Sequence, residues 1–174
     1  MKYFIESQRI GFFVWNKQDE GQAKLLWGNK EVTRYISATG NMTETTILER
    51  LEKEVDTYSK YKIQYFPIYK KEDNKFIGCC GLRPYNIEKN IAEIGVHLLP
   101  EYWGKGYAKE ACMRIIKFAF KSLSFEAIFA GHNPNNLASC ELLKKLGFAY
   151  SHDEYYAPTG LKHPSYLLNK ELFI

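Results

Sequence analysis

The spacing of hydrophobic residues predicts strands and short helices in the first half of the chain. Aromatic and β-branched residues gather in four segments that each predict a strand: 9–15, 61–69, 76–83 and 91–98. Only short polar segments separate the last three, so they predict an antiparallel meander. Between the first strand and the meander, loosely spaced apolar residues over 18–36 predict one or two short helices.

A longer helix is predicted over 41–61, directly before the meander. Thr43 is placed to cap its start, and Glu49 and Lys53 stand four residues apart, a spacing that favours an ion pair. The apolar residues that recur at helical spacing are Ile47, Leu48, Leu51 and Val55. This helix therefore presents one apolar face to the sheet.

The second half of the chain alternates helix and strand. A one-sided apolar stripe predicts a helix over 107–123, and a short apolar strand follows at 125–131. Another helix is predicted over 133–148, and 149–158 and 162–174 close the chain as two strands. A meander followed by a strand–helix–strand crossover predicts the α/β (α+β) class. We expect a single mixed, mostly antiparallel sheet flanked by helices.

Composition adds limits to this picture. A chain of 174 residues predicts a single domain, residues 1–174, with a sizeable core. The net charge is +4, from 24 basic and 20 acidic residues, and no long run of Lys and Arg indicates a nucleic-acid partner. A weak positive charge suits an anionic small ligand, and it equally suits plain solubility.

The cysteines and the apolar runs bear on the compartment. Cys79 and Cys80 are adjacent, which fits neither a disulfide framework nor zinc-binding spacing, and Cys112 and Cys140 are isolated. We interpret all of them as small buried hydrophobes and expect no metal. The opening segment is too polar for a secretory leader, and no apolar run is long enough to span a membrane. We expect a reduced, cytoplasmic, soluble protein.

Gly104 and Gly106 surround Lys105 just before the helix at 107–123. The first N–H groups of a helix have no partner within it, and glycine lets the backbone approach an anion closely. The spacing matches neither a nucleotide-triphosphate loop nor a dinucleotide fingerprint. By itself, this segment is either a phosphate-binding loop or an ordinary turn.

Its flanks resemble a known family. The stretch "AEIGVHLLPEYWGKGYAKEA", residues 92–111, resembles the acetyl-CoA-binding signature of the GCN5-related N-acetyltransferases (GNAT), [QR]-x-x-G-x-[GA]. "NNLASCELLKKLGF" resembles the Asn-x-x-Ser helix of the family, and "FIGCCGLRPYN" and "ESQRIGFFVW" resemble two of its strands. The resemblance runs in order along nearly the whole chain and is nearest to the RimJ/RimL-type branch.

The resemblance implies an acetyl-CoA-binding fold in which backbone N–H groups hold the pyrophosphate. The implied loop reads Trp103, Gly104, Lys105, Gly106, Tyr107 and Ala108. Trp103 departs from the pattern, because the family usually has Gln or Arg there. A tryptophan still supplies the backbone N–H, and Lys105 or Lys109 can compensate for a lost side-chain bond.

Glu93 is the candidate general base. It stands among apolar residues of the strand at 91–98, so desolvation would raise its pKa toward neutral. We expect it to act through a water; the alternative is a solvated or lysine-paired carboxylate. His97 can lie on the same face of the strand as Glu93. It is then either an auxiliary base or, as we prefer, a histidine with a structural role. Gly95 indicates a bulge or a close approach of another part of the backbone. The resemblance implies that Val96, His97 and Leu98 contact the cofactor. It also implies that a backbone N–H near Leu98 polarises the thioester carbonyl.

Asn136 and Ser139 lie on one face of the helix over 133–148, because they are three residues apart. Their structural alternatives are a helix cap and a small packing residue. The resemblance implies that Asn136 binds the pantetheine amide. Many members of the family place a Tyr general acid where this chain has Leu143, and the RimJ/RimL-type branch uses the serine, here Ser139.

Together these features predict an acetyl-CoA-dependent N-acetyltransferase that works by direct transfer. The acceptor is a primary amine, either of a small molecule or of a protein N-terminus; the partners include no nucleic acid and no membrane, and the protein is a monomer or homodimer. The alternatives are an acyl-CoA-binding sensor or scaffold without turnover, and a plain α/β domain that binds no coenzyme A.

Overall fold

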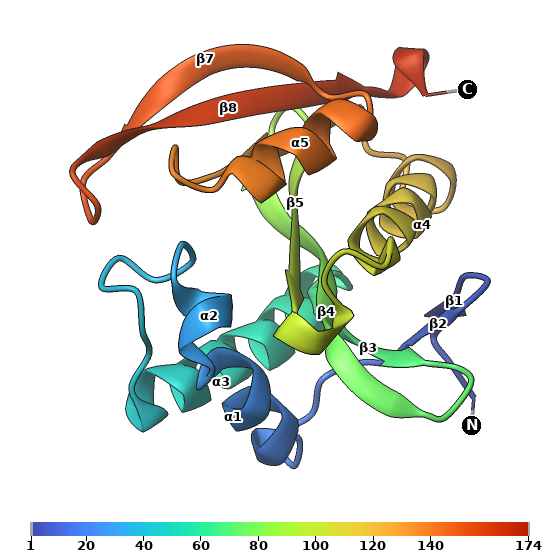
Figure 1. The fold of residues 1–174 in the computed structure, drawn as a ribbon. Coiled ribbons are helices and arrows are strands. Elements are labelled where there is room, and N and C mark those ends of the chain that lie inside the picture. Colours follow the sequence, from blue (N-terminus) through green and yellow to red (C-terminus); the bar gives the residue numbers. More distant parts are fainter. Residues whose placement is uncertain (1, 174) are drawn as a thin grey trace.

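The computed structural model describes residues 2–173, which form a single eight-stranded mixed sheet with helices on both faces (Figure 1). The sheet order is β1-β2-β3-β4-β5-β6-β8-β7, and only β5 and β6 pair in parallel. The strands are β1 Ile5–Glu6, β2 Ile10–Phe12, β3 Tyr65–Lys70, β4 Lys75–Asn86, β5 Ile91–Leu98, β6 Ala127–Gly131, β7 Ala149–Tyr156 and β8 Leu161–Asn169. The expected fold class and meander are confirmed.

Five helices connect these strands. Their bounds are α1 Glu20–Trp27, α2 Lys30–Thr33, α3 Glu44–Tyr61, α4 Tyr107–Lys121 and α5 Leu137–Lys145. The Thr43 hydroxyl oxygen accepts the Thr46 N–H at 3.2 Å, so the expected cap of α3 is confirmed. The expected ion pair between Glu49 and Lys53 is wrong, since those side chains form no bridge in the described structure and Arg50 pairs with Glu54 instead.

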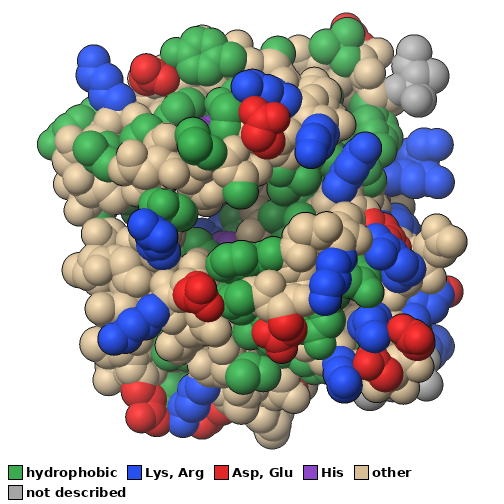
Figure 2. Space-filling model, viewed as in Figure 1, with side chains coloured by type: hydrophobic (Ala, Val, Ile, Leu, Met, Phe, Trp, Pro, Cys, Tyr) green, Lys and Arg blue, Asp and Glu red, His purple; other side chains and the backbone are tan. Residues whose placement is uncertain are grey.

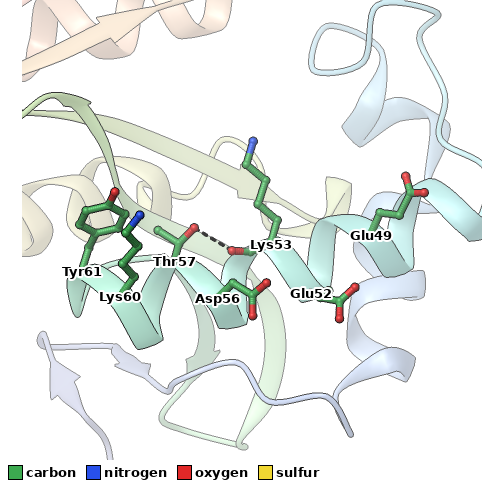
Figure 3. A pocket seen from close by; sticks show the side chains of 7 residues that line it. All are labelled: Glu49, Glu52, Lys53, Asp56, Thr57, Lys60 and Tyr61. Atoms are coloured by element: carbon green, nitrogen blue, oxygen red, sulfur yellow. Dashed lines mark hydrogen bonds between the residues drawn. The ribbon is translucent and has the colours of Figure 1, made fainter.

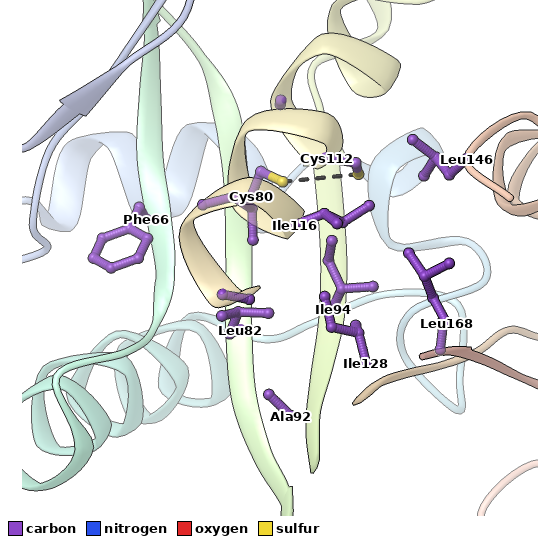
Figure 4. Close-up of a cluster of buried hydrophobic side chains, with 14 of the residues drawn as sticks. Phe66, Cys80, Leu82, Ala92, Ile94, Cys112, Ile116, Ile128, Leu146 and Leu168 are labelled. Atoms are coloured by element: carbon purple, nitrogen blue, oxygen red, sulfur yellow. Dashed lines mark hydrogen bonds between the residues drawn. The ribbon is translucent and has the colours of Figure 1, made fainter. Parts of the chain in front are cut away.

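The two faces of the sheet carry separate cores. On one face, α4 and α5 cover Cys80, Leu82, Ala92, Ile94 and Ile128 (Figure 4). On the other face, α1, α2 and α3 cover a cluster that includes Trp15, Trp27, Tyr65, Cys79 and Leu99. Because side chains alternate along a strand, Glu93 and His97 point to this second face while Ala92 and Ile94 point to α4.

Several element boundaries differ from the expected ones. The strand expected over 61–69 begins at Tyr65, because α3 continues to Tyr61, and the helix expected over 133–148 is shorter, Leu137–Lys145. The strand expected over 9–15 ends at Phe12, because Trp15 turns into the second core, where its indole N–H donates to the Tyr65 carbonyl at 2.6 Å. The last strand ends at Asn169 and is followed by a short 3-10 turn, and Ile174 lies outside the described residues. The hairpin of β7 and β8 places β8 beside β6 and leaves β7 at the edge of the sheet.

Candidate active site

β5 and β6 separate partway along their length, and this opens the sheet. Their pairing runs only from Ile91 with Ala127 to Glu93 with Phe129. β5 continues to Leu98 with β4 as its only partner. We call the side of Ile94–Leu98 that faces away from β4 the splayed edge of β5.

Backbone groups along the splayed edge are available to a ligand. The N–H of Leu99 donates to Ile77 at 2.9 Å, on the β4 side. Since backbone groups of successive strand residues point to opposite edges, those of Val96 and Leu98 face the opening. The Leu98 carbonyl accepts the Trp103 indole N–H at 2.8 Å and is therefore occupied, so the group that Leu98 can offer to a ligand is its N–H.

The glycine loop, Trp103 to Ala108, joins the end of this strand to α4. Gly104 has φ +69° and Gly106, which caps α4, has φ +81°, so both adopt the left-handed conformation that favours glycine. A Cβ at Gly104 would meet no heavy atom within 4 Å. The space beside Gly104 is therefore open, and the first N–H groups of a helix have no partner within the helix, an arrangement that suits an anion.

Side chains hold the glycine loop from both ends. The Lys105 ammonium donates to the Glu101 carbonyl at 2.6 Å, so it is folded back onto the preceding turn. From the residue before β2, the Arg9 guanidinium donates to the Lys105 carbonyl at 3.1 Å and pairs with Glu110 of α4 at 2.6 Å. The Arg9 guanidinium also lies 4.3 Å from the centre of the Tyr107 ring.

The start of α5 brings Asn136 and Ser139 together. The Asn136 side-chain oxygen accepts the Ser139 N–H at 3.2 Å, so the structural alternative for Asn136, a helix cap, is observed. Its amide nitrogen and the Ser139 hydroxyl have no hydrogen-bond partner in the part of the chain described, and both remain available to a ligand. Sequence reasoning missed Tyr166 of β8, whose hydroxyl lies 3.6 Å from the Cys140 sulfur.

Glu93, the last residue of β5 that pairs with β6, directly precedes the splayed edge. Burial raises its pKa above the ordinary value, the positive charges of Arg83, Arg50 and Lys53 oppose that rise, and Glu154 adds to it. Its oxygens accept no hydrogen bond from residues 2–173 and form no ion pair there. The side chain is half-buried, and the carboxylate is free to take a proton, directly or through water.

Beneath Glu93 lies a cluster of charges that sequence reasoning missed. The Glu54 side chain is 1% exposed, and one of its oxygens accepts Arg50 at 2.8 Å and Arg83 at 3.3 Å. Its other oxygen accepts the Tyr65 backbone N–H at 2.8 Å. We call Arg50, Glu54 and Arg83 the arginine cluster. One signal was present in the sequence: Glu54 interrupts the apolar face that carries Ile47 and Leu51.

His97 is held in a structural role. Its Nδ1 accepts the Trp27 indole N–H at 3.1 Å, which places the ring proton on Nε2. Burial and the guanidinium groups of Arg50 and Arg83 hold the pKa of His97 well below its ordinary value, so the ring is neutral. These contacts favour the structural alternative over an auxiliary base.

Gly95 marks a close approach rather than a bulge. A Cβ there would lie 2.3 Å from the Tyr65 hydroxyl, and the register of β4 and β5 is regular at this residue. The Tyr65 ring is itself fixed, with the Arg83 guanidinium 4.3 Å from its centre. Gly95 therefore leaves room for the aromatic ring beneath the splayed edge.

Gly95→Ala is expected to destabilise the protein by about 1–3 kcal/mol, because the added methyl must displace the fixed Tyr65 ring. Thermal or denaturant unfolding measures the change. Gly21→Ala on α1 is the matched control, since a Cβ there meets nothing within 4 Å and alanine favours a helix. Equal stability of the Gly95→Ala variant and the parent protein would contradict the tight packing of Tyr65.

The surface is hollowed between the layer of α5, β7 and β8 and the layer of α1–α3 (Figures 1 and 2). A separate shallow groove lies on the exposed side of α3 (Figure 3), and its lining mixes charges from Glu49, Glu52, Lys53, Asp56 and Lys60. That groove includes none of the expected site residues. No cluster of His, Cys, Asp and Glu within residues 2–173 could hold a metal ion. Likewise, none of the described helices has the length and apolar character needed to cross a bilayer.

Comparisons with known proteins agree with this geometry. Residues 9–149 match the family model of the acetyltransferase (GNAT) domain. The uncharacterized N-acetyltransferase p20 of Bacillus licheniformis is 34% identical over 122 residues, which cover 70% of this chain and 68% of that protein.

Solved structures share the fold. RimL, a ribosomal L7/L12 alpha-N-protein acetyltransferase in complex with coenzyme A, superimposes with a TM-score of 0.82 at 11% identity, over 98% of this chain and 99% of that one. Spermidine N-acetyltransferase from Vibrio cholerae, in complex with CoA and spermine, gives 0.78 at 16% identity, over 96% and 99%. With a splayed strand, a glycine loop and this family match, the chain belongs to the GNAT family of N-acetyltransferases.

Proposed function

We propose that this N-acetyltransferase moves the acetyl group of acetyl-CoA directly onto a primary amine, with both substrates bound together. The observation that carries the proposal is the splayed edge of β5, which lies between Glu93 and the segment that leads to the glycine loop. Residues 1–174 form one catalytic domain in this proposal. The cytoplasmic location and the choice between monomer and homodimer stay predictions.

The glycine loop and the start of α4 hold the pyrophosphate through backbone N–H groups. Val96 and Leu98 offer backbone groups to the pantetheine arm, and His97 supports this strand from the other face. The Asn136 amide nitrogen is free to donate to the same arm while its oxygen caps α5. The thioester then lies beside Leu98, whose N–H polarises the carbonyl.

Transfer forms a bond between the amine nitrogen and the acetyl carbon and breaks the carbon–sulfur bond. The ammonium proton passes to Glu93 through a water. The departing thiolate takes a proton from Ser139, whose hydroxyl has no other partner in the described chain, and the second proton lost by the nitrogen restores the Ser139 hydroxyl through a water. Holding the two reactants together supplies several kcal/mol of the rate enhancement.

The test is a thiol-release assay with acetyl-CoA and a panel of amines, with products identified by mass spectrometry. Protein N-termini and small-molecule amines both belong in the panel, because the solved relatives named above include a ribosomal-protein and a spermidine acetyltransferase. Acetylated product with stoichiometric thiol release is expected. Tight binding of coenzyme A without any product would favour the alternative, an acyl-CoA sensor or scaffold.

A further inference from the structure

The arginine cluster carries more positive than negative charge. Two guanidinium groups, of Arg50 and Arg83, share a single oxygen of Glu54. The side chains of the two arginines are 12% and 25% exposed, so the charges lie largely away from solvent. Glu54 alone does not offset both charges. The second carboxylate whose charge acts on Arg83 is Glu93, which forms no hydrogen bond or ion pair with it within residues 2–173.

Both guanidinium groups are fixed in position. Their central carbons lie 4.3 Å (Arg83) and 5.3 Å (Arg50) from the centre of the Tyr65 ring, and Arg50 also lies 4.8 Å from the Trp27 ring. Aromatic stacking and the shared Glu54 oxygen limit their rotation. A ligand therefore meets prearranged donors and loses little entropy in ordering them.

Donors remain unused on both arginines. The Arg50 Nη2 is buried and has no hydrogen-bond partner, which is the only such buried side-chain nitrogen or oxygen among residues 2–173. Within residues 2–173, Arg83 donates from one nitrogen only, to Glu54, and its side chain is partly exposed. A planar guanidinium with free, neighbouring N–H groups is the geometry that binds a carboxylate through two hydrogen bonds.

The free side of Arg83 lies next to the candidate base. Arg83 and Glu93 are directly opposite in the pairing of β4 with β5, so their side chains leave the same face about 5 Å apart. An α-amino acid carries its amino group and its carboxylate on one carbon, so a single small ligand can face both side chains. Glu154, the other nearby carboxylate, is already bonded to Tyr85 and His152 at 3.3 and 3.1 Å.

We propose that the acceptor is a small amine that carries a carboxylate close to its amino group, and that Arg83 binds this carboxylate while the amine faces Glu93. This inference rests on the proposed function and names its substrate class. Arg50 contributes its charge and fixes Glu54 and Tyr65 beneath Arg83. A polycation such as spermidine would place additional positive charge against both arginines, and the same contacts oppose it.

The experiment compares matched acceptors on the whole protein with acetyl-CoA. Free L-amino acids are set against their amides, with spermidine, an amino sugar and a short peptide as amines without an adjacent carboxylate. The acid of the best pair is expected to have a KM at least about ten-fold below that of its amide. Acetylation of the amides or the other amines as efficiently as the acids would overturn the inference and leave the proposed function intact. Failure to acetylate any amine, despite coenzyme A binding, would overturn the function itself.

Arg83→Gln then assigns the carboxylate contact. The variant is expected to raise KM for the acid at least about ten-fold, to change KM for the amide little, and so to remove the preference. Arg83→Lys keeps the charge but loses the planar guanidinium. Its KM for the acid is expected to lie between those of the parent and Arg83→Gln, and it replaces Arg83→Gln if that variant does not fold. Lys60→Gln, an exposed charge change on α3, is the control. An undiminished preference for the acid in either folded Arg83 variant would overturn the role of Arg83.

Discussion

Glu93→Gln is expected to lower kcat at least about ten-fold near neutral pH, because the variant keeps the shape of the side chain but loses its basicity. Burial raises the pKa of Glu93, so the parent carboxylate is a stronger base than an exposed glutamate. Coenzyme A binding should change little, since the proposed contacts to the cofactor are made by other residues. The loss should shrink at high pH, where the acceptor amine deprotonates without help.

The measurement is the pH–rate profile. Its interpretation must include the neighbouring charges, because they also act on the pKa of Glu93. Arg83 on β4 and Arg50 and Lys53 on α3 oppose the raised pKa, while Glu154 on β7 supports it. Below its pKa, Glu93 holds a proton, so parent activity should rise as pH increases through that pKa. Glu88→Gln, at an exposed turn residue, controls for the loss of one negative charge. A Glu93→Gln profile parallel to the parent at every pH would remove Glu93 from the mechanism.

Ser139→Ala separates the acid from the base. It should also lower kcat, but without recovery at high pH, because its task is to protonate the departing thiolate. Full activity in this variant would assign the acid role to water or to a tyrosine. Tyr166 is the candidate, since burial and the neighbouring Cys140 raise its pKa and keep the phenol protonated.

Gly106→Val is expected to weaken coenzyme A binding at least about ten-fold and to cost about 1–2 kcal/mol of stability. The stability cost arises because a β-branched residue is strained at φ +81°. The affinity loss arises because the new side chain stands where the backbone approaches the pyrophosphate. Calorimetric titration with coenzyme A measures the affinity, and thermal unfolding measures the stability.

Gly160→Val is the matched control for this variant. Gly160 also has a left-handed φ, +67°, and nothing lies within 4 Å of its Cβ position, but it sits in the turn between β7 and β8. Both variants should lose similar stability, and only Gly106→Val should lose affinity. Unchanged affinity in a folded Gly106→Val protein would mean that the glycine loop does not hold the pyrophosphate.

Features fixed by local sequence were predictable. The bounds of β5 and the Thr43 cap of α3 follow from residues within a few positions of each other. The glycine loop was recognised for the same reason, because its backbone conformation depends on Gly104 and Gly106 themselves.

Features that depend on distant pairing were not predictable. Arg83 and Glu54 are 29 residues apart and meet only because α3 packs across β4. Periodicity indicates that Glu54 is buried but not which cations neutralise it. Similarly, Trp15 lies outside the expected strand and packs in a core with residues of α1 and β3, and no local pattern predicts this position.

The contacts of Arg9 with the glycine loop and α4 have a consequence for the order in which parts of the chain fold. The bonds from Arg9 to Glu110 join residues 101 positions apart, whereas β5, α4 and β6 follow one another directly along the chain. Contacts between distant residues carry the larger loop-closure cost and tend to form late. We therefore expect Arg9 to reach the glycine loop and α4 after α4 has folded. A ligand bound to the glycine loop would stabilise the contacts of Arg9 and so protect the amino-terminal strands from proteolysis.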